Sequence, residues 1–245
     1  MKKILCTAAL LFIASPVLAA TFVNGGFEVG DLSGWTGGGG SWGGNPAYPV
    51  NPSYYNGGPA NNSIMNGGVD PITGQNRVYN GSYSVRVNDS INNYSVSTIR
   101  QSVTNYTDAH IYFQWNAVLE ASHGTTDSDY FSLSLRDDTD GVDIVTRQYS
   151  SATAPGIFTQ FGSWYGSGWQ LEDISIGTNL LGHDFTLTLL ASDCPYGGHA
   201  GYVYLDGFAP TIIPPGPTVP EPATMLLFGT GLAGLAAFGR RKATK

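Results

Sequence analysis

Positive charge and cysteine are both scarce in this 245-residue chain, and each scarcity excludes a class of function. Between residues 21 and 219 there are five arginines and no lysine against 17 Asp and Glu, a net charge of −12. Such an acidic body excludes a nucleic-acid partner, because phosphate binding requires clustered cationic residues. The same segment has a single cysteine, Cys194, so it has no internal disulfide. We interpret Cys194 as a buried small side chain, with a nucleophilic, modified or intermolecularly bridged thiol as the alternatives.

Helical periodicity is almost absent from this segment, and short runs of alternating apolar and polar residues take its place. Turn-forming sequences such as "DDTDG", "TAPG" and "PYGG" separate the runs. Such alternation is typical of antiparallel strands with one face in the core and one in water. We therefore expect residues 21–210 to form one all-β domain, an antiparallel β-sandwich (jelly roll). The predicted strands are residues 83–87, 96–103, 110–119, 130–137, 143–149, 185–192 and 201–208.

The N-terminal segment, residues 1–20, has the composition of a Sec signal peptide. Lys2 and Lys3 precede an apolar run at residues 4–18, and small residues near position 20 offer a cleavage site. The apolar run is short for a membrane span, which disfavours the alternative of an uncleaved anchor. We therefore expect the domain to be exported.

Two further segments differ in composition from the predicted strands. Residues 37–81 are rich in Gly, Asn, Pro and Ser with interleaved aromatic residues, a composition that resists regular structure. We expect them to form a long irregular excursion over the sandwich. Residues 211–219 are rich in proline, which predicts a semi-extended linker that holds the domain away from the tail.

The tail, residues 220–245, combines an apolar run with a basic end. Residues 223–239 are uncharged, and as a helix they would be roughly 26 Å long, the lower limit for a bilayer span. Under the positive-inside rule the basic end stays in the cytoplasm, so the tail would anchor the exported domain in the inner membrane. A plain tail anchor is one interpretation of this pattern. The basic end, residues 240–245, contains Arg240, Arg241 and Lys242.

The elements of this tail also resemble the PEP-CTERM sorting signal in their order, spacing and position. They are Pro220, Glu221 and Pro222, the Gly-containing apolar run and the basic end, about the last 26 residues. The resemblance implies that exosortase, a membrane protease-transpeptidase of Gram-negative bacteria that make exopolysaccharide, recognises the tail. It also implies transient inner-membrane anchoring, processing near Pro-Glu-Pro, and release to the cell surface or extracellular matrix. Proline suits such recognition, because it keeps the peptide out of the helix.

Three short stretches of the body resemble galactose-binding-like jelly rolls, which include carbohydrate-binding modules. They are "NGGFEVGDLSGWT" (24–36), "GSYSVRV" (81–87) and "YVYLDGF" (202–208). The resemblance implies that the first of them forms a strand beside the last strand. Relatives of this fold hold a structural calcium ion at the positions of Glu28 and Asp206, so calcium is the one cofactor that the resemblance implies. The alternative is a surface Glu and a turn-capping Asp.

Aromatic side chains in Gly-rich stretches are the candidate ligand-binding groups. Such rings stack on sugar rings while Asn, Asp and Gln bind the hydroxyls. The alternative is that they pin long loops onto the sandwich. The candidates are Trp42, Tyr48, Tyr54 and Tyr55 in the Gly/Asn-rich excursion, and Trp164, Tyr165 and Trp169 in "FGSWYGSGW".

Catalytic signatures are missing: the sequence has no G-x-S-x-G, H-E-x-x-H or P-loop motif. The acidic stretch "RDDTDGVD" (136–143) lacks the spacing of an EF-hand and is predicted to be a polar hairpin turn. We therefore expect an exported, non-catalytic protein of the cell surface or exopolysaccharide matrix. The alternatives are a carbohydrate-binding module that stacks polysaccharide on exposed aromatics, and a glycan-active enzyme.

Overall fold

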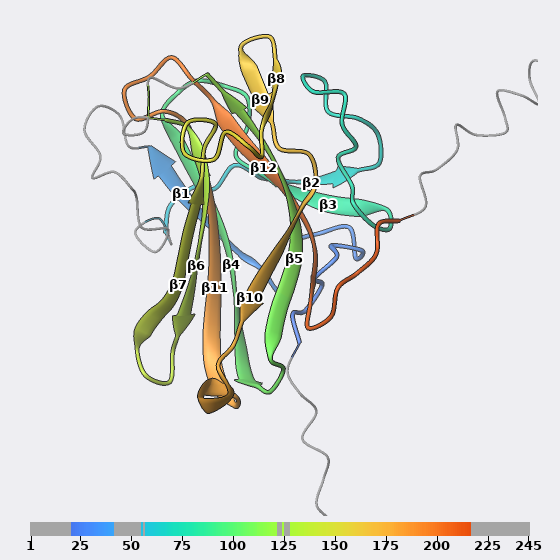
Figure 1. Cartoon of the computed structure of the whole chain (residues 1–245), viewed down its shortest axis with the longest axis vertical. Helices are drawn as coiled ribbons and strands as arrows, with labels where there is room; N and C mark the ends of the chain where they lie inside the picture. Colours follow the sequence, from blue (N-terminus) through green and yellow to red (C-terminus); the bar gives the residue numbers. More distant parts are fainter. Residues whose placement is uncertain (1–20, 42–54, 56, 122–123, 125–127, 217–245) are drawn as a thin grey trace, which may run out of the picture.

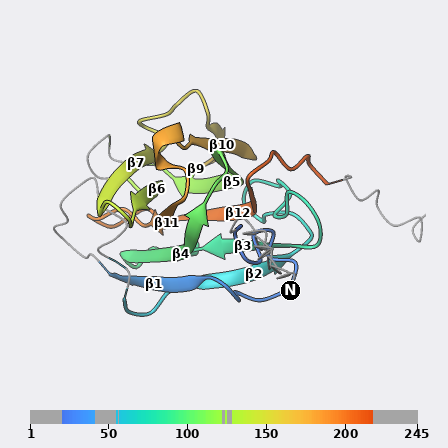
Figure 2. The same ribbon diagram turned by 90° about the horizontal axis from the view of Figure 1, so that it is seen from below.

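Two antiparallel β-sheets packed face to face form the domain (Figure 1; Figure 2). The computed structural model describes residues 21–41, 55, 57–121, 124 and 128–216. The predicted all-β antiparallel sandwich is confirmed. The predicted signal peptide and tail helix lie outside the described residues, and within those residues no helix has the length and apolar character needed to cross a membrane.

The two sheets differ in size. Sheet A has the strand order β1–β4–β11–β6–β7, and sheet B has the order β2–β3–β12–β5–β9–β8, with β10 paired to the other end of β5. The strands of sheet A are β1 (Thr36–Ser41), β4 (Ser95–Tyr106), β11 (His183–Ser192), β6 (Tyr130–Asp137) and β7 (Val142–Tyr149). The strands of sheet B are β2 (Asn62–Asn66), β3 (Tyr83–Val87), β12 (Gly201–Ala209), β5 (His110–Glu120), β9 (Trp164–Gly166), β8 (Thr159–Phe161) and β10 (Gln170–Ser175).

The hydrophobic core lies between the sheets and follows from the alternation within the strands. Leu133 of β6 lies opposite Leu189 of β11, and both side chains are fully buried in the core, whereas their neighbours in sequence are on the outer face. Sheet B contributes larger side chains to the same cluster, Trp115 and Phe113 of β5 among them. Full burial of a Leu or Phe side chain stabilises the fold by roughly 1.5–3 kcal/mol, so this cluster is the main source of stability.

All seven predicted strands are present, as β3, β4, β5, β6, β7, β11 and β12. Two parts of the range 37–81, for which an irregular excursion is predicted, are strands, because β2 and all but the first residue of β1 lie in it; residues 42–54 and 56 lie outside the described residues. Glycines make up most of β1, and at one of these positions a larger residue would clash with neighbouring backbone. A Cβ at Gly39 would lie 2.5 Å from the carbonyl oxygens of Pro59 and Val96. The backbone at these two residues therefore approaches β1 to a distance that only glycine permits.

The prediction of a first strand at residues 24–36 is wrong, since residues 21–35 form turns. Their amides bond locally, as when the Phe27 amide donates to the carbonyl of Asn24 at 3.0 Å. Aromatic packing fastens this segment to the last strand: the rings of Trp35 and Phe208 are 4.6 Å apart, and both side chains are buried. The Phe208 amide also donates to the carbonyl of Gly25 at 3.0 Å. The segment therefore lies beside β12, as predicted, without being a strand.

Candidate functional site

A polar hollow of about 330 Å³ on the outer face of sheet A is the candidate binding surface of this domain. Strand register produces its floor, because Arg100, Thr188 and Ser134 lie side by side on β4, β11 and β6. All three share the outer face, since they alternate with core residues. The lining residues are Arg100, Ser134, Arg136, Asp138, Asp143, Thr186 and Thr188.

Hydrogen bonds hold one wall of this hollow in place. The Thr186 hydroxyl donates to the Asp138 carboxylate at 2.6 Å, and the Arg136 guanidinium lies 3.3 Å from the same carboxylate. The hollow therefore presents hydroxyls, guanidinium groups and carboxylates, and those of Thr186, Arg136 and Asp138 contact one another. Such a mixture of donors and acceptors is suited to a ligand that is itself rich in hydroxyl groups.

Tyr55 lies on this same face of sheet A. Its ring packs against Val96, Tyr130 and Leu190, and its carbonyl accepts a hydrogen bond from the Thr98 hydroxyl at 2.8 Å. Thr98 is on the same strand and face as Arg100, so Tyr55 shares the outer face of sheet A with the hollow without being one of its lining residues. The other aromatic candidates of this region, Trp42, Tyr48 and Tyr54, lie outside the described residues.

Trp164 and Trp169 lie on the opposite side of the sandwich, over the outer face of sheet B. Both rings pack in a cluster with Tyr202 and Tyr204 of β12. The indole of Trp169 donates to the carbonyl of Asn76 at 2.9 Å, so it fastens the segment between β2 and β3 onto sheet B. The structure therefore does not bring these two tryptophans together with Tyr55, and their contacts are those of residues that pin a loop.

Asp70 anchors the same segment over sheet B. Its buried carboxylate accepts hydrogen bonds from the hydroxyls of Tyr202, at 2.6 Å, and Tyr204, at 2.9 Å. The Thr73 amide donates to its other oxygen at 2.7 Å. Burial alone would raise the pKa of Asp70, but the hydrogen bonds from Tyr202, Thr73 and Tyr204 outweigh it and lower the pKa below its usual range.

The structure brings Glu28 and Asp206 to the same turn, between Tyr79 and Tyr83. The Asp206 carboxylate accepts from the amides of Tyr79 and Asn80, both at 3.0 Å. The Glu28 carboxylate accepts from the Ser82 amide at 3.0 Å. Between them, Gly81 has a left-handed backbone (φ 75°), and a Cβ there would collide with the Glu28 carboxylate.

In the pair formed by Glu28 and Asp206, the Oδ1 atom of Asp206 has the character of a cation ligand. Asp206 is 1% exposed, and among the described residues its Oδ1 atom has no hydrogen-bond partner. Burial, with a smaller contribution from the negative charge of Glu28, raises the pKa of Asp206 to about 7 although backbone hydrogen bonds oppose the shift. A buried carboxylate oxygen with a second carboxylate nearby fits the oxygen-rich coordination of calcium. Glu28 and Asp206 are thus the residues that would hold a structural calcium ion.

The stretch "RDDTDGVD" forms the predicted polar hairpin turn between β6 and β7, with the Gly141 amide donating to the Asp137 carbonyl at 2.8 Å. Potential ligand atoms of Asp137, Asp140 and His183 lie within 4.8 Å of one another there. Hydrogen bonds already account for the Asp137 carboxylate, which lies 2.8 Å from His183 Nδ1 and accepts from the Thr139 amide at 3.0 Å.

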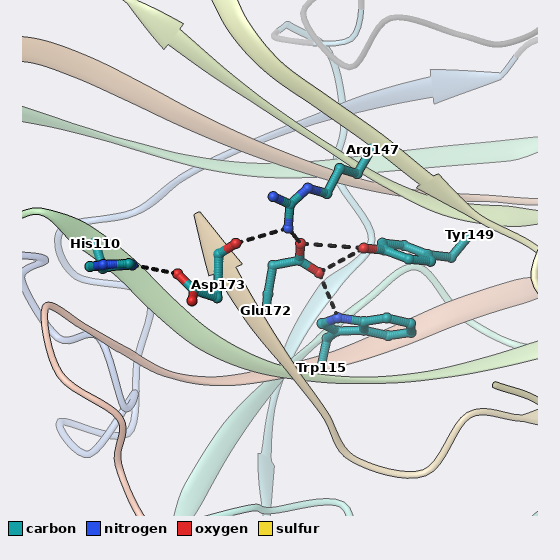
Figure 3. A network of polar contacts seen from close by, with 6 residues as sticks. All are labelled: His110, Trp115, Arg147, Tyr149, Glu172 and Asp173. Carbon is teal, nitrogen blue, oxygen red and sulfur yellow. Dashed lines mark hydrogen bonds and ion pairs between the residues drawn. The ribbon is translucent and has the colours of Figure 1, made fainter. Parts of the chain in front are cut away.

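A buried polar network lies where β10 of sheet B faces β7 of sheet A, and the sequence analysis did not identify it (Figure 3). Glu172 of β10 is 2% exposed and accepts from Trp115 Nε1 and from the Tyr149 hydroxyl, each at 3.0 Å. Arg147 pairs with the same carboxylate and donates to the Asp173 carbonyl at 2.9 Å. Burial, together with the charge of Glu172, raises the pKa of Tyr149 to about 12. The network joins the two sheets along one open side.

The comparisons with known proteins concern first the tail and then the fold. Residues 218–242 match the PEP-CTERM protein-sorting motif, which confirms the resemblance found in the tail. The motif implies that the protein is exported and sorted at a membrane. No curated protein matches the chain.

Solved structures of similar fold are mostly carbohydrate-binding modules. TmCBM61, determined with β-1,4-galactotriose, has a TM-score of 0.44 and 14% identity, covering 77% of this chain and 96% of its own. CBM28, a module specific for non-crystalline cellulose, has a TM-score of 0.41 and 14% identity, covering 80% and 98%. CBM27-1 of Caldicellulosiruptor saccharolyticus, determined with mannohexaose, has a TM-score of 0.40 and 11% identity, covering 77% and 97%. These likenesses concern the β-sandwich fold alone.

Proposed function

We propose that this chain is an exported, non-catalytic protein of the cell surface or exopolysaccharide matrix, held in the inner membrane and then processed by an exosortase-type enzyme. The observation that supports this proposal is the sorting motif at residues 218–242, which follows the folded domain by a short Pro-rich segment. The last strand, β12, ends at Ala209, and hydrogen bonds of Pro214 and Gly216 to Asn80 and Tyr79 still hold the chain to the domain, so the motif follows the folded domain directly in the sequence.

The second candidate function is polysaccharide binding, and the hollow on sheet A favours it. Its lining hydroxyls, guanidinium groups and carboxylates match the hydroxyls of a sugar chain, and Tyr55 supplies an aromatic ring on the same face of sheet A. The outer face of sheet B is the weaker candidate surface, because the segment anchored by Asp70 and Trp169 covers part of it.

Affinity electrophoresis in gels that contain the exopolysaccharide of the host tests this second function. Arg100→Ala and Arg136→Ala each remove a donor from the hollow, and we expect each to weaken binding roughly 10- to 100-fold, since hydrogen bonds from charged groups contribute roughly 1.5–3 kcal/mol. Arg77→Ala is the matched control, because it removes the same charge from the segment over sheet B. Unchanged retardation of both hollow variants would exclude the hollow as the binding surface.

We also propose that Glu28 and Asp206 hold a structural calcium ion. The buried Oδ1 atom of Asp206 supports this assignment, and the ion would fasten the N-terminal segment and the turn at Gly81 to β12. Asp206→Asn should lower the melting temperature in calcium while leaving the melting temperature in chelator nearly unchanged. A variant that melts lower by the same amount in both buffers would instead indicate a purely hydrogen-bonding role.

A further inference from the structure

Two buried aspartates face each other at the end of sheet A opposite the β6–β7 hairpin. The ladder between β6 and β11 ends with Tyr130 opposite Ser192, so the adjoining residues, Asp129 and Asp193, continue the register as the next pair. Asp129 is 1% exposed and Asp193 is fully buried. Two carboxylates directly opposite each other repel, and burial strengthens that repulsion.

Asp193 is surrounded by donors that suit an ionised carboxylate. The amides of Asn93 and Ser95 donate to its Oδ2 atom at 3.0 and 2.9 Å, and the Asn88 side chain donates to its Oδ1 atom at 3.1 Å. A carboxylate that accepts several hydrogen bonds is stabilised in its charged form. Burial nevertheless outweighs these hydrogen bonds and raises the pKa of Asp193 above its usual range.

Asp129 has the opposite surroundings. Both of its carboxylate oxygens are buried, and among the described residues neither has a hydrogen-bond partner. Burial raises the pKa of Asp129 well above its usual range, and the negative charges of Glu120 and Asp193 act in the same direction. A proton on Asp129 would remove the charge but would still leave a buried carboxyl group that has no partner in the described part of the chain, which is costly. A hard cation satisfies both oxygens and the charge together.

We propose that Asp129 and Asp193 form a second calcium-binding site, distinct from that of Glu28 and Asp206. Glu120, at the partly exposed end of β5, lies near enough to add a third negative charge to the same region. An exported protein meets free calcium at concentrations that suit such sites, because extracellular modules bind it with Kd values of roughly 0.1–1 mM.

The two sites lie near opposite ends of β12. A Cβ at Gly201, where β12 begins, would be 3.0 Å from the Asp129 Cβ, whereas Asp206 is five residues further along the strand. At about 3.3 Å per residue the sites are roughly 17 Å apart. They can therefore be tested independently of each other.

Calcium stoichiometry and thermal melting of the protein purified from its host test this proposal. In equilibrium dialysis, Asp206→Asn should retain one calcium ion that the double variant Asp129→Asn/Asp206→Asn has lost. In the Asp206→Asn background, saturating calcium should raise the melting temperature by roughly 5–10 °C over chelator, and Asp129→Asn should abolish that rise. Asp108→Asn, which removes a partly exposed carboxylate between β4 and β5, is the matched control and should leave both readouts unchanged.

The Asp129→Asn variant could fail to fold for reasons unrelated to calcium. A second measurement therefore uses protein in which Asp129 is unchanged. Terbium(III) bound at Asp129 should show luminescence excited through the adjacent Tyr130, and calcium should displace it. Retention of the full calcium stoichiometry by Asp129→Asn would overturn the proposal. So would absence of displaceable terbium luminescence from the Asp206→Asn protein, which would identify Asp129 as a buried neutral acid.

Discussion

Glu172 provides the sharpest test of how the two sheets are held together. Its carboxylate is 2% exposed and accepts hydrogen bonds from Trp115 and Tyr149, while Arg147 neutralises its charge. Glu172→Gln keeps the size of the side chain but removes the charge and replaces one acceptor oxygen by a donor. That donor must then face groups that are themselves donors.

The expected loss of stability follows from the partners of the Glu172 carboxylate. Breaking a buried ion pair by removing one partner typically costs about 3–5 kcal/mol. The Arg147 side chain is 39% exposed and is able to turn toward water, so we expect a smaller cost, about 2–4 kcal/mol. For a domain of this size that corresponds to a fall in melting temperature of roughly 5–15 °C.

Thermal denaturation of Glu172→Gln, Arg147→Met and the double variant measures this coupling. Arg147→Met leaves a buried charge with only neutral donors, so it should also destabilise the fold. The double variant should lose less stability than the two single changes added together, because each single change already breaks the pair. Additive losses, or a loss below about 0.5 kcal/mol for Glu172→Gln, would refute the account of this network.

Two further changes test other parts of the fold. Gly39→Ala should destabilise the domain by about 1–3 kcal/mol, because the new methyl group overlaps the carbonyl oxygens of Pro59 and Val96; chemical denaturation measures it, and a neutral result would contradict the close crossing over β1. Asp70 has a lowered folded-state pKa, so its stabilising contribution is present above its usual pKa and lost as the pH falls through the lower value. Melting of the wild type between pH 5 and 3 should therefore fall more steeply than that of Asp70→Asn, and equal slopes would argue against the anchoring role of this carboxylate.

The strands that were predicted from sequence share one property: they alternate apolar and polar residues and bury one face. The strands β1 and β2 lack that property. In β1 four consecutive glycines leave no side chains from which to detect alternation, and the need for glycine arises from the distant residue Pro59. Local composition therefore could not distinguish a close backbone crossing from an irregular loop.

The candidate sites also differ in whether the sequence could predict them. The approach of Glu28 to Asp206 was predicted from the resemblance of the sequence to a known fold, and the structure places both at one turn. The Glu172 network joins strands far apart in the sequence, and a single Glu among polar neighbours gave no signal for it. The pairing of Asp129 with Asp193 likewise depends on register between β6 and β11, which no local pattern specifies.

The mass of the C-terminal peptide tests the central claim most directly. The protein is recovered from its native host, separately from the envelope and from the medium, and its terminal peptides are measured by mass spectrometry. Sorting through the PEP-CTERM motif predicts a new terminus near Pro220–Pro222 in the released fraction, without Arg240, Arg241 and Lys242. An intact terminus at Lys245, found only in the inner membrane, would contradict processing and leave a plain tail-anchored protein.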